Sequence, residues 1–555
     1  MGTWRDRAMA RLAGEHFDVL VIGGGITGAG VALDAAARGL RTALVERADL
    51  ASGTSSRSSK LVHGGLRYLQ QREFSLVRQN LGERQRLLRN APHLVRPVPF
   101  VVPLLGRRGL VDRAVAQGWS AALWGYDLAG GLRIGSRHRR IGPGEVRDRL
   151  PGIRADLVAG GFLYQDAHAD DARLTLAVAR TAVDRGAVVA TYAPVVALVD
   201  GRYGRVGGAR LADGTTVTAR VVVNATGVWA DWLRGLDGDP APPNLRPARG
   251  AHVTVARHRL PWTSAAVLPA GGGRSVFVVP WCEHVYVGTT DSPHAGPLDE
   301  PACTPEELAY LLAALNAVLA EPLSPVDVVA TWAGLRPLVA DALTAATADL
   351  SRRHRVAVGP SGLVTVTGGK LTTYRAMAAD TVDRAARLLP RAVPGSVTAG
   401  LRLHGAAGSA ELRRPDAAAR LGVKTEVLDH LVGRHGGEAR HLAAMAAGDS
   451  GLGQPLVAGL PYLRAEAVWA ARHELVTTLD DVLSRRARAS VLAPESAWRA
   501  APDVAELVGG ELGWPAARRA EEVAAFRAGL EHERASAGLP PMAPAASAPT
   551  GGVGR

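Results

Sequence analysis

Residues 17–46 read FDVLVIGGGITGAGVALDAAARGLRTALVE, and this stretch decides the fold expected of the chain. Its first six residues form an apolar run rich in branched side chains, which is typical of a buried parallel strand. Gly23, Gly25 and Gly28 follow at once. A helical segment and a second strand come next, and the strand ends at Glu46, whose carboxylate is placed to bind ribose hydroxyls. This order predicts an α/β dinucleotide-binding domain.

Each part of this fingerprint has a physical role in binding the pyrophosphate of a dinucleotide. Gly23 permits the tight turn, Gly25 lets the backbone approach the phosphates, and Gly28 lets helix and strand pack closely. The N-terminus of the helix presents free N–H groups and a partial positive charge to the phosphates. We therefore expect Ile26 and Thr27, which begin the helix, to contact the nucleotide as well.

The bulk composition describes a globular protein of more than one domain. A chain of 555 residues is too long for a single hydrophobic core, so two or three domains are expected. No window approaches twenty uninterrupted apolar residues, and the N-terminus lacks the apolar middle of a secretory signal. The two cysteines, Cys282 and Cys303, have neither metal-binding nor redox spacing. We expect a cytoplasmic protein without disulfides and without a bound metal.

The net charge of +13 has two interpretations. It is typical of proteins that bind nucleic acid or an anionic membrane surface, and it also arises from biased composition. Only three of the 65 basic residues are lysine, namely Lys60, Lys370 and Lys424, which favours compositional bias. No basic patch is interleaved with aromatic residues, so nucleic-acid binding is not expected.

A second strand and turn favour FAD over NAD as the nucleotide. Residues 220–224 form a second apolar strand that leads into the turn Ala225-Thr226-Gly227. Two-part flavoproteins use such a small-residue turn to return the chain to the cofactor. Residues 51–70, ASGTSSRSSKLVHGGLRYLQ, place a cluster of hydroxyl groups after the nucleotide fingerprint.

The run from Ser55 to Tyr68 closely resembles the FAD-dependent, quinone-linked glycerol-3-phosphate dehydrogenases. Lys60 lies inside this run, and Lys370 lies inside another motif of the same family. Because the chain uses arginine almost everywhere else, chance placement of both lysines is improbable. Matching motifs continue in the right order to about residue 490, at 170–174, 288–291, 334–337, 368–375, 472–474 and 483–486.

The resemblance implies an α/β two-part flavoprotein of the glutathione-reductase and D-amino-acid-oxidase type. Its Rossmann-like FAD domain is expected to be discontinuous and interleaved with a mixed-sheet substrate domain. A helical C-terminal domain follows, and a tail rich in Ala, Pro, Gly and Ser is expected to be disordered. The expected ranges are 17–70, 166–235 and 355–390 for FAD, 71–165 and 236–354 for substrate, 410–530 for the helical domain and 536–555 for the tail.

The same resemblance implies that the chain oxidises sn-glycerol 3-phosphate to dihydroxyacetone phosphate by hydride transfer to FAD, with a membrane quinone as electron acceptor. A phosphate dianion needs fixed cations, and the alcohol needs a proton acceptor. Arg336 and Arg352 are expected to hold the phosphate, with the adjacent Arg353 as the alternative to Arg352. His252 is the candidate base, with an arginine or Lys370 as the alternative. The residues matching the family's substrate site are Arg67, Tyr68, His252, Arg336, Arg352, Lys370 and Tyr374, of which His252, Arg336 and Lys370 are the catalytic candidates.

Cofactor contacts are expected from the fingerprint, from the hydroxyl-rich run and from the two glycine turns. The Gly-Gly-Lys turn precedes a helix, whose N-terminus would stabilise reduced flavin. Besides the fingerprint residues, the expected contacts are Thr54, Ser55, Ser59, Lys60, Ala225, Thr226, Gly227, Gly369, Lys370, Leu371 and Thr372.

Several alternatives stay open at this point. An oxygen-using glycerol-3-phosphate oxidase would share the same site, and an amine or amino-acid oxidase of the same fold is a poorer match. A basic flavoprotein that binds RNA or membrane is a further class. A quinone acceptor would require peripheral contact with the inner face of the membrane, for which the segments around Trp119 and Trp124 are candidates. The oligomeric state is open, with a homodimer as one candidate.

Overall fold

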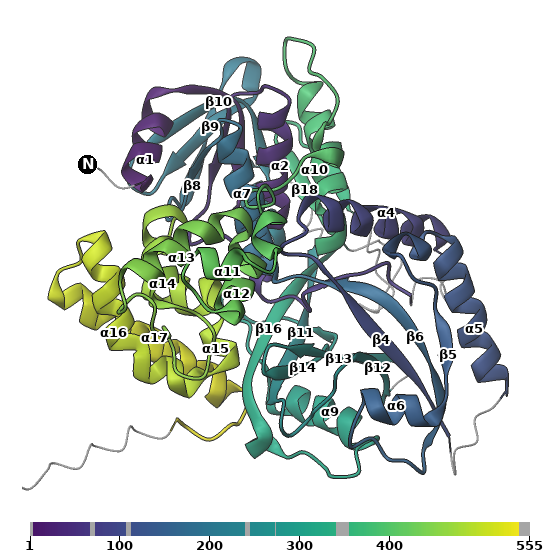
Figure 1. Cartoon of the computed structure of the whole chain (residues 1–555). Coiled ribbons are helices and arrows are strands. Elements are labelled where there is room, and N and C mark those ends of the chain that lie inside the picture. Colours follow the sequence, from purple (N-terminus) through teal and green to yellow (C-terminus); the bar gives the residue numbers. More distant parts are fainter. Residues whose placement is uncertain are drawn as a thin grey trace, which may run out of the picture.

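The computed structural model describes residues 4–66, 73–106, 113–238, 245–271, 274–339 and 354–542. Two β-sheets lie side by side, and a helical region packs against both of them (Figure 1). Among the described residues, no helix combines the length and the apolar character that crossing a membrane requires.

The first sheet is built around β1, which begins the predicted dinucleotide fold. β1 lies between β2 and β10 and is parallel to both. The strand order is β17-β18-β10-β1-β2-β7, and β9 and β8 extend the sheet beside β10. Helices α2, α7 and α10 pack together against it. The bounds are α1 Trp4–Gly14, β1 His16–Ile22, α2 Ile26–Ala37, β2 Thr42–Val45, α7 Asp171–Asp184, β7 Val188–Ala190, β8 Val195–Asp200, β9 Val206–Leu211, β10 Thr216–Asn224, α8 Ala230–Leu236, β17 Arg355–Val358, β18 Val364–Thr367 and α10 Tyr374–Ala386.

The second sheet is mixed and has the order β15-β11-β14-β13-β12-β4-β6-β3, with β16 paired to β11 and β5 paired to β6. Helices α6 and α9 lie on one side of it, and α5 runs along its outer edge (Figure 1). The bounds are β3 Leu61–Val62, α4 Phe74–Asn90, β4 Arg96–Leu105, α5 Arg113–Leu128, β5 Arg139–Ile141, α6 Pro143–Arg149, β6 Val158–His168, β11 Leu245–Ala256, β12 Ala265–Ala270, β13 Arg274–Trp281, β14 His284–Gly288, β15 Ser292–Pro293, α9 Pro305–Asn316 and β16 Val328–Val339.

The chain passes between the two sheets more than once. The first sheet takes its strands from 16–45, 188–224 and 355–367, and the second takes most of its strands from the intervening parts. Two boundaries differ from the ranges expected from sequence. β3 lies inside 17–70 but pairs with β6 in the second sheet, and β6 itself continues to His168. The serine-rich run Ser55–Lys60, which lies between β2 and β3, therefore connects the two sheets directly.

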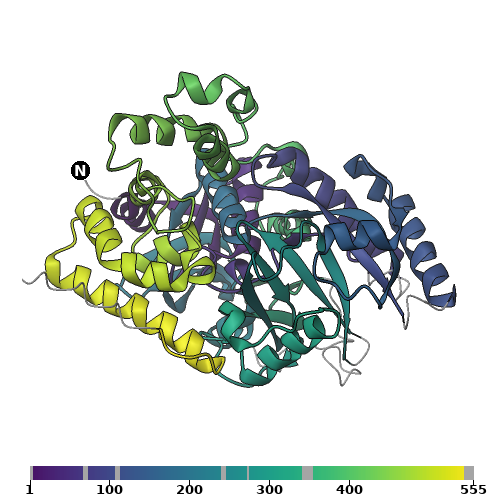
Figure 2. The same ribbon diagram turned by 60° about the horizontal axis from the view of Figure 1, so that its bottom comes forward.

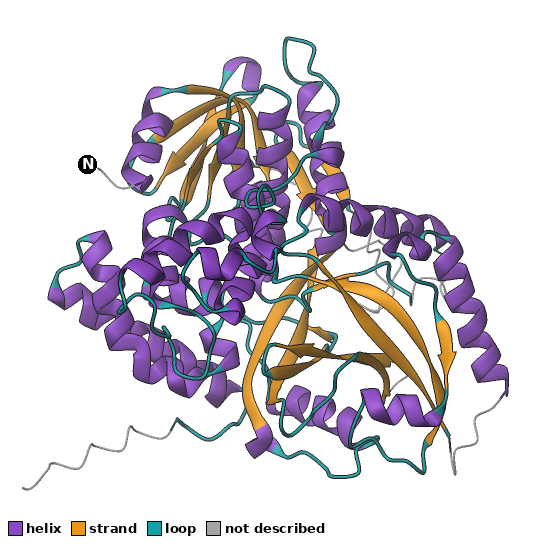
Figure 3. Cartoon of the chain, viewed as in Figure 1, coloured by secondary structure: helices purple, strands orange, loops and turns teal. Residues whose placement is uncertain are grey.

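The C-terminal region consists of helices and loops (Figure 3) and packs beside both sheets (Figure 2). A π-helical turn at Asp481–Arg486 contacts α7, while α15 and α17 contact β16. The remaining bounds are α11 Ala417–Arg420, α12 Thr425–His435, α13 Ala439–Gly448, α14 Arg464–His473, α15 Ala489–Leu492, α16 Pro494–Leu512 and α17 Ala516–Ser536.

The beginning of the predicted tail is ordered, which corrects the expectation of disorder for 536–555. Ala537, Leu539 and Met542 are buried, and the first two belong to a core cluster of the second sheet. Composition missed this contact because a few apolar residues suffice to anchor a segment rich in Pro and Ala. Residues 543–555 lie outside the described part of the chain.

Candidate active site

The glycine fingerprint forms a junction of three backbone segments at the carboxyl end of β1. Gly23 has a φ of +112°, and a Cβ added there would lie 2.6 Å from the carbonyl oxygen of Ala225, in the turn after β10. A Cβ on Gly28, in the first turn of α2, would overlap the carbonyl oxygen of Gly23. Glycine is therefore required at both positions so that β1, α2 and the turn after β10 pack closely.

A cavity of about 970 Å³ opens from this junction and extends to the second sheet. Its volume falls at the upper end of the range for small-molecule and cofactor sites. It brings together residues that are hundreds of positions apart in the chain. The predicted site residues that line it are Gly23, Gly25, Ile26, Thr27, Glu46, Thr54, Ser55, Ser59, Lys60, Ala225, Thr226, Gly227, His252, Arg336, Gly369, Lys370, Leu371 and Thr372.

The nucleotide end of the cavity has the chemistry that FAD requires. Because the N-cap of α2 is Gly25, the first turn of the helix meets the cavity without an intervening side chain, and its N–H groups favour a pyrophosphate there. Ser55 Oγ accepts a hydrogen bond from the Ile26 N–H at 2.9 Å. The Glu46 carboxylate accepts hydrogen bonds from the N–H groups of Gly24 (2.6 Å) and Ala48 (2.9 Å). Burial raises the pKa of Glu46, and these two bonds oppose the shift.

Arg336 lines the same cavity from β16. Its guanidinium donates to Asp291 Oδ1 at 3.0 Å and to Thr289 Oγ1 at 2.9 Å. A Cβ on Gly250 of β11 would overlap the guanidinium, so that glycine leaves the space that the arginine occupies. A fixed guanidinium facing a cavity is the kind of group that binds phosphate.

His252 lies beside Arg336, on β11, and is only 2% exposed. Its ring stacks on Trp332 at 4.8 Å between centroids, and its Nε2 shares a hydrogen bond of 2.8 Å with Ser59 Oγ. Burial, with smaller contributions from the charges of Lys60 and Arg336, lowers the pKa of His252 well below its usual value. Burial therefore favours the neutral imidazole, the form with a lone pair for a proton, and the same burial opposes the imidazolium that would result. Since Ser59 also lines the cavity, its hydroxyl connects the imidazole with any bound alcohol.

Lys370 reaches the same cavity from the turn between β18 and α10. Gly368 and Gly369, which precede it, have φ values of +75° and +83°, a conformation that favours glycine. A Cβ on Gly369 would also overlap the sulfur of Met377 in α10. The two glycines thus turn the chain sharply enough to place Lys370 at the cavity wall.

Tyr374, which was predicted to bind substrate, is corrected to a core residue. It is 3% exposed and starts α10, where its ring packs against Gly30 of α2; a Cβ on Gly30 would lie 2.8 Å from that ring. Tyr374 does not line the cavity. Matching a motif residue by residue cannot show which way each side chain of a helix start points. The predicted residues Arg67, Tyr68 and Arg352 lie outside the described residues.

Comparisons with known proteins agree with this geometry. The family described as FAD dependent oxidoreductase matches residues 18–375, and the C-terminal domain of alpha-glycerophosphate oxidase matches residues 396–519. Glycerol-3-phosphate dehydrogenase 2 of Mycobacterium tuberculosis is 43% identical over 543 residues, which cover 96% of this chain and 91% of that protein. The mitochondrial glycerol-3-phosphate dehydrogenase of Rattus norvegicus is 37% identical, over 92% of this chain and 72% of that protein. The chain belongs to the FAD-dependent glycerol-3-phosphate dehydrogenase family.

A solved structure supports the same conclusion about the fold and the cofactor. The glycerol-3-phosphate dehydrogenase of Bacillus halodurans, determined with FAD, superimposes with a TM-score of 0.77 at 29% identity and covers 96% of this chain and 98% of its own. The predicted two-part α/β flavoprotein fold, the family resemblance and FAD as cofactor are thereby confirmed.

Two features of this dehydrogenase family member escaped the sequence analysis. The Arg47 guanidinium lies 4.2 Å from the ring centroid of Trp229, and both line the nucleotide end of the cavity. Asp166 lines the cavity too, between Arg84 and Tyr126, at 2.7 Å from each. The sequence contained a signal for Arg47, because it directly follows Glu46 of the nucleotide fingerprint. It contained none for Asp166, because the partners of Asp166 come from two separate helices.

Lys60 was predicted to bind the cofactor, but its ammonium group points to Asp171, with Nζ–Oδ1 at 3.3 Å. Burial lowers the pKa of Lys60 to about 8, and the charge of Asp171 offsets part of the effect. The unfolded chain, with a lysine pKa near 10.4, therefore binds more protons than the folded chain between pH 8 and about 10.4. The contribution of Lys60 to the free energy of unfolding must therefore rise with pH in this window.

We accordingly predict a pH-dependent difference between the wild type and Lys60→Met. Between pH 8 and 10.4 the free energy of unfolding of the wild type should rise by about 3 kcal/mol relative to that of the variant, because each unit of pKa difference contributes about 1.36 kcal/mol. Thermal unfolding midpoints measured from pH 7.5 to 10 test this. A difference between the two midpoints that stays constant over the range would contradict it.

Proposed function

We propose that the chain oxidises sn-glycerol 3-phosphate to dihydroxyacetone phosphate and passes the electrons through FAD to a membrane quinone. The observation that carries the proposal is the placement of Arg336, Lys370 and the Ser59–His252 pair on one cavity with the nucleotide fingerprint. Two cations suit a phosphate dianion, and a neutral imidazole suits an alcohol proton. The names of the relatives support the same substrate.

In this proposal each described residue has one task. Arg336 binds the phosphate, because Asp291 and Thr289 hold its guanidinium in place. Lys370 places a second positive charge on the same wall. The hydroxyl proton of the substrate goes to the Ser59–His252 pair; a Lys370 that accepted this proton instead would have to be neutral and could not supply the second charge. FAD, when bound, accepts the hydride from C2. Arg67, Tyr68 and Arg352 stay predictions of substrate contact.

Two electron acceptors are candidates, a quinone and oxygen. The match of residues 396–519 to the C-terminal domain of alpha-glycerophosphate oxidase favours testing oxygen as the second candidate. A quinone acceptor implies peripheral contact with the inner face of the membrane. Trp124 and Leu128 of α5 are exposed and suit such contact. Trp119, also proposed from sequence, is partly buried and lines the cavity instead. A homodimer stays a prediction.

Anaerobic mixing of the FAD-loaded protein with sn-glycerol 3-phosphate tests the donor. We expect the flavin absorbance to bleach with this substrate and to stay unchanged with glycerol, which lacks the phosphate that Arg336 would bind. Loss of absorbance with glycerol or an amino acid, and none with sn-glycerol 3-phosphate, would refute the proposed substrate. Reoxidation of the bleached protein by a quinone analogue, compared with oxygen, then separates dehydrogenase from oxidase.

A further inference from the structure

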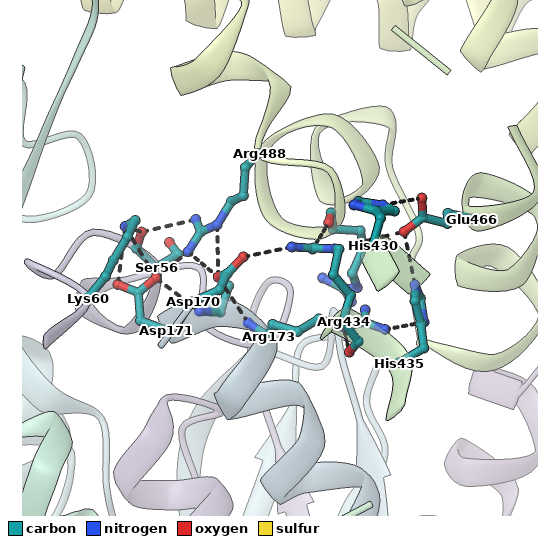
Figure 4. A network of polar contacts seen from close by, with 12 residues as sticks. Ser56, Lys60, Asp170, Asp171, Arg173, His430, Arg434, His435, Glu466 and Arg488 are labelled. Atoms are coloured by element: carbon teal, nitrogen blue, oxygen red, sulfur yellow. Dashed lines mark hydrogen bonds and ion pairs between the residues drawn. The ribbon is translucent and has the colours of Figure 1, made fainter. Parts of the chain in front are cut away.

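A buried ionic network joins the C-terminal helices to the serine-rich run Ser55–Lys60 (Figure 4). Arg488, which precedes α15, donates to Asp170 Oδ1 at 2.8 Å and to the carbonyl oxygen of Ser56 at 3.1 Å, and it is ion-paired with Asp171. The side chains of Asp171 and Arg488 are at most 3% exposed. Three parts of the chain therefore meet in a site shielded from water, and Arg488 lies more than 300 residues along the chain from the other two.

Asp171 connects Arg488 with the serine-rich run through hydrogen bonds and an ion pair. Its Oδ2 accepts hydrogen bonds from the N–H (2.9 Å) and the hydroxyl (2.6 Å) of Ser58, and its Oδ1 pairs with Lys60 Nζ. Lys60 has a φ of +55°, in the left-handed region. A lysine adopts this conformation only where its surroundings hold it. The Arg488–Asp171 pair and the bonds from Ser58 and Lys60 supply that restraint.

The residue between these two anchored positions is Ser59, the partner of His252. Its carbonyl oxygen accepts a hydrogen bond from Tyr286 Oη at 2.6 Å, and its hydroxyl lies 2.8 Å from His252 Nε2. Ser58 and Lys60 are thus held on either side of Ser59, which both contacts His252 and lines the cavity. Neither Arg488 nor Asp171 lines that cavity.

We propose that Arg488 and Asp171 are positioning residues for the reaction, which they affect by holding Ser59 against His252. The inference rests on the proposed function, since it assigns the Ser59–His252 pair to the alcohol proton. It also gives the C-terminal helices a part in the chemistry, through one arginine. A shift of about 1 Å in a positioned group costs on the order of a hundredfold in rate. The effect should therefore appear in the rate of flavin reduction rather than in substrate affinity.

The test uses Arg488→Lys, Ser59→Ala and the double variant in the FAD-loaded full-length protein. Lysine keeps the charge but replaces the planar guanidinium, whose Nε, Nη1 and Nη2 reach Asp170, Ser56 and Asp171 from separate positions, by a single ammonium nitrogen. The matched control is Arg472→Lys, which alters an exposed pair with Glu511 in the same helical region and should stay within twofold of the wild type. Ser58→Ala removes the hydrogen bond from its hydroxyl to Asp171 and the one that this hydroxyl accepts from the Lys60 N–H at 3.0 Å, and it keeps the bond from its own N–H to Asp171.

At saturating sn-glycerol 3-phosphate we expect Arg488→Lys to slow flavin reduction by 10- to 100-fold, with less than a threefold change in substrate affinity and full FAD content. Ser58→Ala should slow it at least threefold. The double variant should match Ser59→Ala alone, because both changes act through the same hydroxyl. Multiplicative losses in the double variant, or unchanged rates in Arg488→Lys and Ser58→Ala, would overturn the proposal.

A second measurement does not depend on activity. In the apoprotein, modification of His252 by diethyl pyrocarbonate, followed by peptide mass spectrometry, should be at least threefold faster in Arg488→Lys than in the wild type or Arg472→Lys. Equal rates in all three would argue against positioning. This readout also separates the two hypotheses: a wild type that sn-glycerol 3-phosphate does not bleach refutes the proposed substrate, while the modification rates still report whether Arg488 holds the Ser59–His252 pair.

Discussion

Arg336→Ala should lose nearly all activity toward sn-glycerol 3-phosphate while retaining FAD. The guanidinium faces the cavity and is held by Asp291 and Thr289. Each hydrogen bond to a charged group contributes roughly 1.5–3 kcal/mol, and guanidinium binds phosphate through two of them. We therefore expect kcat/KM to fall by about 10²- to 10⁴-fold, measured by steady-state reduction of a quinone analogue. The flavin absorbance of the purified variant should equal that of the wild type.

Two further variants make this result specific to phosphate recognition. Arg336→Lys keeps one point charge and should recover part of the activity. Arg259→Ala removes an exposed arginine of the same part of the chain, paired with Asp327 at 2.7 Å, and should change kcat/KM less than twofold. An unchanged kcat/KM in Arg336→Ala would show that this residue does not bind the substrate. Loss of FAD from the variant would show that the arginine supports the cofactor instead.

Gly28→Ala should abolish FAD binding. The added methyl group would overlap the carbonyl oxygen of Gly23 and lie 3.0 Å from its carbonyl carbon. Gly23 has little freedom to move, since its N–H donates to the Val45 carbonyl oxygen at 2.9 Å. Helix α2 must therefore shift away from β1, at a cost of about 1–3 kcal/mol in stability, and its N–H groups leave the position that suits the pyrophosphate. We expect the bound FAD to fall below about a tenth of the wild-type content.

Gly14→Ala is the control for this substitution. Gly14 ends α1 in the same region of the chain, and an added Cβ would meet no atom within 4 Å. FAD content and unfolding midpoint should stay at the wild-type values or rise slightly. Flavin absorbance after gel filtration and thermal unfolding measure both quantities. Full FAD content in Gly28→Ala would show that the close contact of helix and strand is dispensable for the cofactor.

Much of the nucleotide end was predictable because its determinants are local. β1, the glycine turn, α2 and β2 follow one another within 31 residues, from His16 to Glu46. Backbone sterics and hydrophobic periodicity decide such a unit almost regardless of the rest of the chain.

The substrate end was predicted only through the family resemblance, and less completely. His252 and Arg336 both line the cavity and their roles stay predictions, whereas the ring of Tyr374 packs in the core between α2 and α10. The direction of a side chain depends on how two elements pack, and no single motif contains that information. For the same reason Lys60 was expected at the cofactor, although its ammonium group pairs with Asp171.

By itself, the sequence determined the dinucleotide fingerprint and, through the family's ordered motifs, the family and FAD as its cofactor. Only the tertiary structure decided that the Ser59 hydroxyl meets His252, that Gly250 leaves room for Arg336, and that Arg488 anchors the serine-rich run. The physical reason lies in sequence separation. The first set depends on neighbours along the chain, whereas the second depends on burial of charges and close packing between segments up to about 430 residues apart.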